Sequence, residues 1–261
     1  MGFWSSLGSC ISSACSAVGS GIRSCCSAVS NFVGSGLGKA VGFGLSALKV
    51  ICPQARVLDT VFKSISLMSK IAGVFANVIK PNENIQDIGD RALQAEEQGI
   101  TRESCKNYDE YMEKIRSVQL DPEVTKQTPE SNKEFAGSIV VENGIKEKMP
   151  NLQTSSLWAI AALAPAIFTK ERIDNWVKLA DKHKIPLASI SKFLLSTLGK
   201  KFNLSDFKEL ANVNADQGRD LVVNAEKQLN PGAQDSDIFK NVEEMKSSIN
   251  NGFSECEKNS Q

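Results

Sequence analysis

GSGIRSCCSAVSNFVGSGLGKAVGFG, residues 19–44, is the stretch that decides how the N-terminal part of this chain folds. It is rich in glycine, serine and alanine, and Arg23 and Lys39 are its only charged residues. A flexible Gly/Ser linker would not keep its large apolar residues in phase. Here apolar residues recur at steps of three or four, which predicts a helix with one continuous apolar stripe. The stripe contains Leu7, Ile11, Ala14, Val18, Ile22, Cys25, Val29, Phe32, Gly36, Ala40 and Phe43.

The small residues of this region predict close contact between helices. The tetrapeptide Cys-Ser-Ala-Val occurs at 15–18 and again at 26–29. The two copies are three helical turns apart, so equivalent residues lie on the same face of the predicted helix. Each glycine costs an isolated helix about 1 kcal/mol relative to alanine, but small residues let helix backbones approach closely in lipid. We expect these helices to pack in a bilayer or against the protein's own body. The candidate membrane and helix-packing residues are Gly19, Gly21, Gly34, Gly36, Gly38, Gly42, Gly44, Phe32 and Phe43.

The length of the apolar region suits a membrane, whereas its hydropathy is marginal. Residues 24–38 carry no charge, and the apolar character continues over 40–48, which together reach the roughly 20 residues that a span requires. Serine, glycine and asparagine dilute this run. Such a balance is typical of a protein that is soluble first and enters a membrane later. A small-residue helix buried in a soluble bundle is the alternative.

The fold class expected for the whole chain is all-α, a glycine-rich N-terminal helical hairpin followed by a C-terminal helical bundle. Three regions are predicted: a membrane-interacting region over 1–80, a polar helical connector and linker over 81–135, and an all-helical body over 136–261. The second hairpin helix begins after Pro53 and ends by Pro81. Residues 120–134 resemble a linker or long loop. Residues 138–141 fit a short strand or a helical turn.

The last third of the chain shows a series of helix signals. Residues 156–168 are almost wholly apolar and predict a core helix that Pro165 kinks or ends. Thr169 is expected to cap the next helix, and Pro186 to begin a helix that ends at Gly199. Further helices are predicted after Ser205 and over 218–229 and 235–252.

Charge and cysteine content limit the partners and the compartment. Lys+Arg and Asp+Glu number 30 each, so no nucleic-acid partner is expected. The seven cysteines are an odd number and suit synthesis in a reducing bacterial cytoplasm. The N-terminus lacks the basic start of a cleaved signal peptide. Possible lipidation sites are Gly2, within a myristoylation-like pattern, and Cys10, Cys15, Cys25 and Cys26.

No catalytic constellation is recognisable in the sequence. His183 is the single histidine, and it lies between two lysines as a surface residue would. A thiol nucleophile at Cys105 could in principle pair with it, but no local signature supports that pairing. Phosphate-binding, metalloprotease and hydrolase motifs are absent. We therefore expect a protein that is not an enzyme, with no cofactor and no metal.

Residues 19–44 resemble, in residue character, the glycine-zipper segments of bacterial pore-forming effectors, including those delivered by type VI secretion. The resemblance covers about a fifth of the chain and carries over no catalytic residue. It implies secretion without a cleaved signal, self-association in a target cell's membrane, depolarisation of that membrane, and a cognate immunity protein or a secretion-machine carrier as partner. Two other hypotheses remain: a structural or adaptor component of a phage or secretion assembly, and an acylated effector acting at host membranes.

Overall fold

The structure is a computed structural model that describes residues 36–51, 55–201 and 208–259. All regular secondary structure in these ranges is helical, which confirms the all-α prediction. Residues 138–141, for which a strand was one option, lie inside a helix. One hydrophobic cluster includes side chains from each of the three predicted regions, from Leu37 to Cys256.

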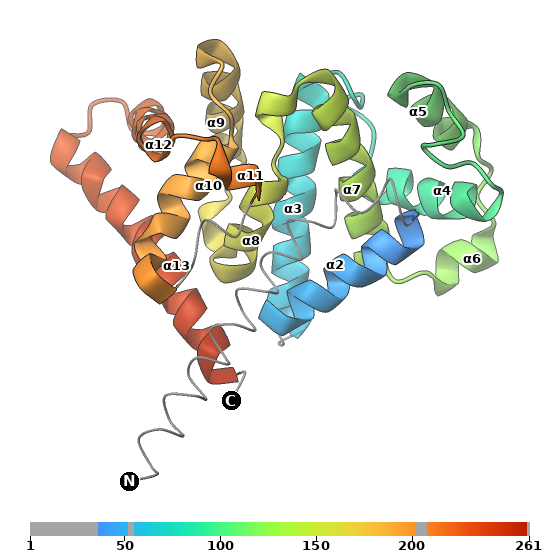
Figure 1. Ribbon diagram of the computed structural model, residues 1–261, viewed down its shortest axis with the longest axis horizontal. Helices are drawn as coiled ribbons and strands as arrows, with labels where there is room; N and C mark the ends of the chain where they lie inside the picture. Colours follow the sequence, from blue (N-terminus) through green and yellow to red (C-terminus); the bar gives the residue numbers. More distant parts are fainter. Residues whose placement is uncertain (1–35, 52–54, 202–207, 260–261) are drawn as a thin grey trace, which may run out of the picture.

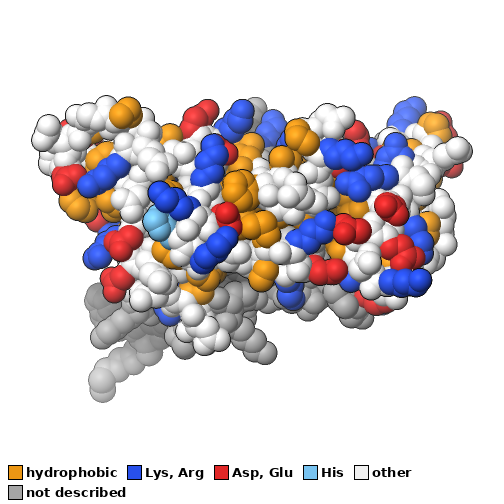
Figure 2. Space-filling view, turned by 90° about the horizontal axis from the view of Figure 1, so that it is seen from above, with side chains coloured by type: hydrophobic (Ala, Val, Ile, Leu, Met, Phe, Trp, Pro, Cys, Tyr) orange, Lys and Arg blue, Asp and Glu red, His pale blue; other side chains and the backbone are white. Residues whose placement is uncertain are grey.

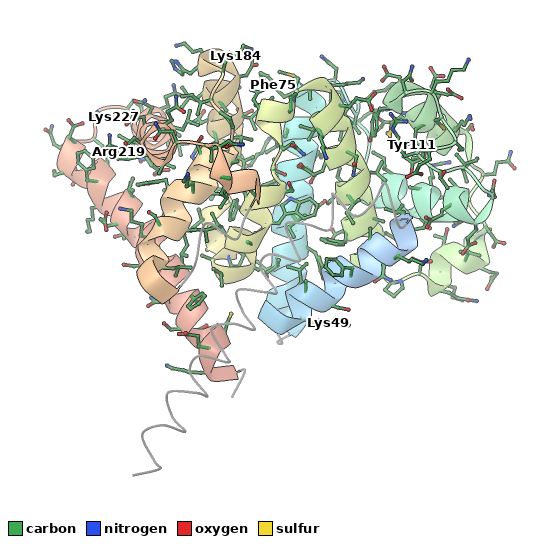
Figure 3. The ribbon with its side chains drawn as sticks, viewed as in Figure 1. Lys49, Phe75, Tyr111, Lys184, Arg219 and Lys227 are labelled. Carbon is green, nitrogen blue, oxygen red and sulfur yellow. The ribbon has the colours of Figure 1, made fainter. Side chains whose placement is uncertain are left out.

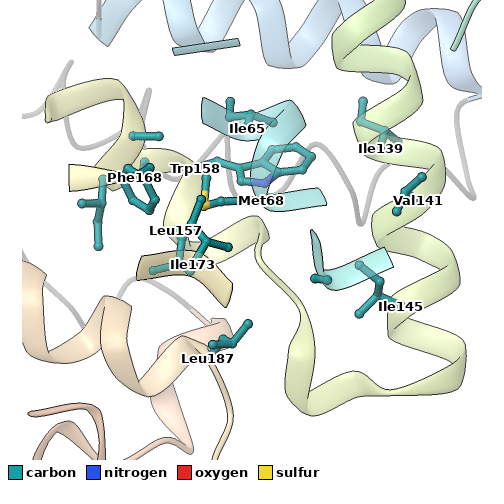
Figure 4. Close-up of a cluster of buried hydrophobic side chains, with 14 of the residues drawn as sticks. Ile65, Met68, Ile139, Val141, Ile145, Leu157, Trp158, Phe168, Ile173 and Leu187 are labelled. Carbon is teal, nitrogen blue, oxygen red and sulfur yellow. The ribbon is translucent and has the colours of Figure 1, made fainter. Parts of the chain in front are cut away.

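The core is built on α3 (Ala55–Phe75), α7 (Glu130–Lys148) and α8 (Ser155–Leu163). Figure 1 shows α3 running through the middle of the molecule with α7 and α8 on either side. Every residue of α8 is buried, as its apolar sequence predicts, and η2 (Pro165–Ile167) follows its end. Trp158 is fully buried beside Met68 and Ile65 of α3 (Figure 4).

A close crossing joins α7 to α4 (Ile85–Glu97). Gly89 of α4 and Gly137 of α7 lie at this crossing, where each helix backbone takes the place of a side chain on the other. Two further glycines make comparable contacts: Gly218 meets the backbone of Ser189, and Gly252 meets that of Leu163. Backbone contact through glycine therefore occurs outside the glycine-rich N-terminal region.

The prediction of an irregular linker over 120–134 is wrong. This stretch contains α6 (Pro122–Gln127) and the first turn of α7, and α5 (Tyr108–Ser117) precedes it. Asp121 caps α6 by accepting a hydrogen bond from the Glu123 N–H at 2.8 Å. Buried Gln94 of α4 donates to Thr125 Oγ1 at 3.1 Å and accepts from the Asp121 N–H at 2.8 Å. These bonds attach α6 to the body.

The C-terminal part contains α9 (Lys170–His183), α10 (Ala188–Leu195), α11 (Lys208–Ala211), α12 (Ala215–Leu229) and α13 (Asp235–Asn259). Thr169 caps α9 as predicted, because its hydroxyl accepts a hydrogen bond from the Arg172 N–H at 3.3 Å. The helix after Pro186 is shorter than expected: α10 ends at Leu195, and η3 (Ser196–Lys201) follows. The last helix is longer than expected and continues to Asn259.

The helix α2 (Leu37–Ile51) is the described part of the glycine-rich region. Its buried side contacts α7, α4 and α8. No helix of the described residues is both long enough and apolar enough to span a bilayer. The buried residues of α2 follow a helical period and are Leu37, Ala40, Val41, Gly44, Ala47 and Leu48.

Candidate functional site

The outer face of α2 is the candidate site, and it comprises Lys39, Gly42, Phe43, Ser46 and Lys49. These residues are exposed and recur at steps of three or four, so they form one stripe opposite the buried side. Phe43 is 42% exposed and lies between the two lysines along the helix. Lys49 lies near the lower end of α2 (Figure 3). The helix itself contains no acidic residue.

The start of α2 is held by a carboxylate from a helix that comes later in the sequence and contacts α2 directly. Glu96 of α4 accepts hydrogen bonds from the backbone N–H groups of Leu37, at 2.5 Å, and Gly38, at 2.8 Å. A helix N-terminus has unpaired N–H groups and a partial positive charge, which a carboxylate satisfies. Glu96 therefore fixes where α2 begins and how it lies on the body.

The glycines at the start of α2 make room for this carboxylate. Gly36 has a φ of +83°, which a side chain rarely permits, and a Cβ there would lie 2.3 Å from Glu96 Oε1. A Cβ on Gly38 would lie 3.3 Å from Glu96 Oε2. The sequence predicts helix packing at these positions, whereas the structure places a carboxylate against them.

The remaining predicted packing residues have different surroundings. Gly42 faces open space, Gly44 is buried, and Phe43 is exposed, although the predicted stripe runs through it. Gly19, Gly21, Phe32 and Gly34 lie outside the described residues, so their packing role stays a prediction. The possible lipidation sites lie outside them as well: Gly2, Cys10, Cys15, Cys25 and Cys26.

The thiol–histidine pair considered from the sequence is not assembled. Cys105 is buried just before α5, and His183 is exposed in the last turn of α9. Figure 1 shows α3 and α7 lying between α5 and α9. The exposed position of His183 confirms that it is a surface histidine.

A cavity of about 390 Å³ lies between η2, α9, α12 and α13. Its wall includes an ion pair in which Arg172 Nε donates to Glu226 Oε1 at 2.6 Å, with Glu226 only 1% exposed. Arg172 Nη1 also donates to the Ile167 carbonyl oxygen at 2.7 Å. The pair therefore links α9 to α12 and to η2. Arg172 and Glu226 thus have a structural role in this wall.

A second buried acid lies at the centre of the core. The Glu142 carboxylate accepts hydrogen bonds from the Thr154 N–H, at 3.0 and 3.1 Å, and from the Thr154 hydroxyl. Trp158 Nε1 donates to the same hydroxyl oxygen at 3.2 Å. Burial raises the pKa of Glu142 to about 7, although hydrogen bonds from Thr154 and Ser155 act to lower it. The network joins α7 to the start of α8.

Among the described residues, no group of three or more histidine, cysteine, aspartate or glutamate side chains could hold a metal ion. Seen from above, the molecule shows basic and acidic side chains interspersed (Figure 2). This mixture differs from α2, where the charged residues are lysines alone. The only signal in the sequence for the outer face of α2 is the pair Lys39 and Lys49 in an otherwise uncharged region.

The chain matches no protein-family model, and no match was found among curated proteins or solved structures. The resemblance of residues 19–44 to glycine-zipper effectors therefore stays a prediction.

Proposed function

We propose that this protein is a membrane-active effector of bacterial type that permeabilises or depolarises a target membrane. It is made in the bacterial cytoplasm and acts at the membrane of the target cell, where it self-associates. The glycine-rich N-terminal part of the chain meets the membrane, while α3, the second helix of the predicted hairpin, belongs to the core of the helical body. A cognate immunity protein or secretion-machine carrier is its expected protein partner.

The observation that supports the proposal is the exposed outer face of α2, whose only charges are basic, at the end of an apolar, glycine-rich segment. Exposed Phe43 lies between exposed Lys39 and Lys49, so this face offers one apolar side chain and two cations to a membrane surface. The preceding 35 residues carry Arg23 as their only charge. Apolar residues combined with lysine or arginine favour an anionic bilayer over water.

The test is dye release from liposomes by the intact chain and by two matched double variants. V29E/F32E places two charges on the apolar stripe, and S27E/S30E places the same charges on the serine side. We expect rapid release by the wild type and by S27E/S30E, and at least a tenfold slower release by V29E/F32E. Substitution is preferable to removing residues 1–50, because Leu37, Val41 and Leu48 belong to the core.

The alternative of a structural or adaptor component predicts a different result. Such a protein would release no dye from vesicles of any composition, and V29E/F32E would instead weaken assembly measured by sedimentation. Ion conductance across a planar bilayer would then be absent for wild type as well. Absence of both dye release and ion conductance for the wild type would refute the membrane-active proposal.

A further inference from the structure

The outer face of α2 combines two lysines and a phenylalanine on one side of a helix that cannot turn that side inward. Leu37, Val41 and Leu48 on the opposite side are each at most 3% exposed and belong to the hydrophobic core. The Glu96 carboxylate also holds the first turn of α2. Among the described residues, this face therefore points away from the helices on which α2 packs.

The charges of the first 58 residues all have one sign. Residues 1–58 contain Arg23, Lys39, Lys49 and Arg56 and no aspartate or glutamate. Among the described residues, neither Lys39 nor Lys49 has an acidic partner within ion-pair distance. Glu96, the acid at the start of α2, is occupied by two backbone N–H groups. Charge complementarity therefore selects an anionic surface as the occupant.

The length of α2 limits how it can meet a bilayer. Its 15 residues extend about 22 Å, less than the roughly 30 Å thickness of a hydrocarbon core. A helix lying in the interface instead buries an aromatic side chain at the headgroup boundary and keeps its lysines among the headgroups. Phe43 between Lys39 and Lys49 fits that orientation.

We propose that the outer face of α2 binds the surface of an anionic bilayer while α2 stays docked on the helical body. The helix is then the platform from which residues 1–35 enter the membrane, and it does not itself insert. This inference rests on the proposed function and adds the lipid class and the part of the chain that recognises it.

Binding is tested by co-sedimentation of the intact chain with phosphatidylcholine vesicles and with vesicles containing one-quarter phosphatidylglycerol. We expect strong binding to the anionic vesicles only. K39E/K49E should weaken that binding at least tenfold, since each lysine near such a surface contributes about fivefold. F43A should weaken it several-fold. The matched controls K170E/K240E and F239A alter exposed residues of α9 and α13 and should bind as wild type.

Docking of α2 is tested by hydrogen exchange on the same vesicles. The backbone amides of residues 40–48 should keep the protection they have in solution. Loss of that protection on anionic vesicles, with the rest of the body unchanged, would show that α2 leaves the body. It would refute the proposal that α2 stays docked while its outer face binds lipid.

Dye release separates this inference from the proposed function. If wild type releases dye and K39E/K49E binds and releases equally well, the lipid-binding role of α2 is wrong and the proposed function survives. If K39E/K49E loses binding but wild type releases no dye, α2 recognises lipid and the proposed permeabilisation is wrong.

Discussion

Gly137 of α7 lies so close to Ile85 of α4 that a methyl group on Gly137 would be 1.9 Å from the Ile85 carbonyl oxygen. This distance is far below van der Waals contact, and the atom that would be struck belongs to a backbone. The crossing of α4 and α7 therefore requires glycine at this position.

Replacing Gly137 with alanine should lower the free energy of unfolding by about 2 to 3 kcal/mol, because the two helices must separate. Urea denaturation monitored by circular dichroism measures the change. The matched control is G42A, since Gly42 is a helical glycine facing open space. That variant should raise the free energy of unfolding by up to about 1 kcal/mol. A loss of stability in both variants, or in neither, would contradict the packing described here.

The sequence does not show which glycines contact the backbone of another helix. Spacing alone identifies glycines able to admit another backbone, and it favoured Gly38 and Gly42 in the apolar region. Which backbone approaches which glycine depends on tertiary contacts, and the structure brings backbones to Gly89 and Gly137, which spacing did not single out. Phe43 illustrates the same limit, because a period of three or four residues fits two neighbouring stripes on α2.

Local signals were more reliable than regional composition. Thr169 was correctly predicted as a cap because one hydroxyl and the following three residues determine that interaction. The sequence Asp121-Pro122 carries an equally local signal for the start of α6, but the polar composition around it favoured a linker. Buried Gln94 makes hydrogen bonds to residues 27 and 31 positions later in the chain, which no local pattern reveals.

Removing the Glu96 carboxylate should loosen α2. E96A deprives the Leu37 and Gly38 N–H groups of their acceptor, which should reduce stability by about 1 to 2 kcal/mol. Hydrogen exchange should accelerate over residues 40–48 and remain unchanged in α8 and α9. E97A, at the exposed neighbouring position, is the control and should leave α2 as it is. Equal exchange rates in E96A and wild type would show that apolar contacts alone hold the helix.

Glu142 should make stability decrease as the pH rises toward neutrality. Its pKa is about 7 in the folded protein, because burial disfavours the charged form, and 4.5 ordinarily. Between these values the folded protein holds a proton that the unfolded chain has lost, so the free energy of unfolding falls as pH increases. The full difference of pKa corresponds to about 3 kcal/mol, so a loss of about 1 to 3 kcal/mol is expected between pH 5 and pH 8.

The E142Q variant isolates this contribution, because glutamine keeps a hydrogen-bond acceptor for Thr154 but does not titrate. Urea denaturation of both proteins at intervals from pH 5 to pH 8 should show E142Q gaining stability relative to wild type as the pH rises. Half-buried Glu134, whose pKa is also raised by burial, contributes equally to both proteins and cancels in the comparison. The exposed substitution E97Q should leave the profile parallel to wild type. If the E142Q and wild-type profiles were parallel throughout this range, Glu142 would not titrate in the folded protein as its burial requires.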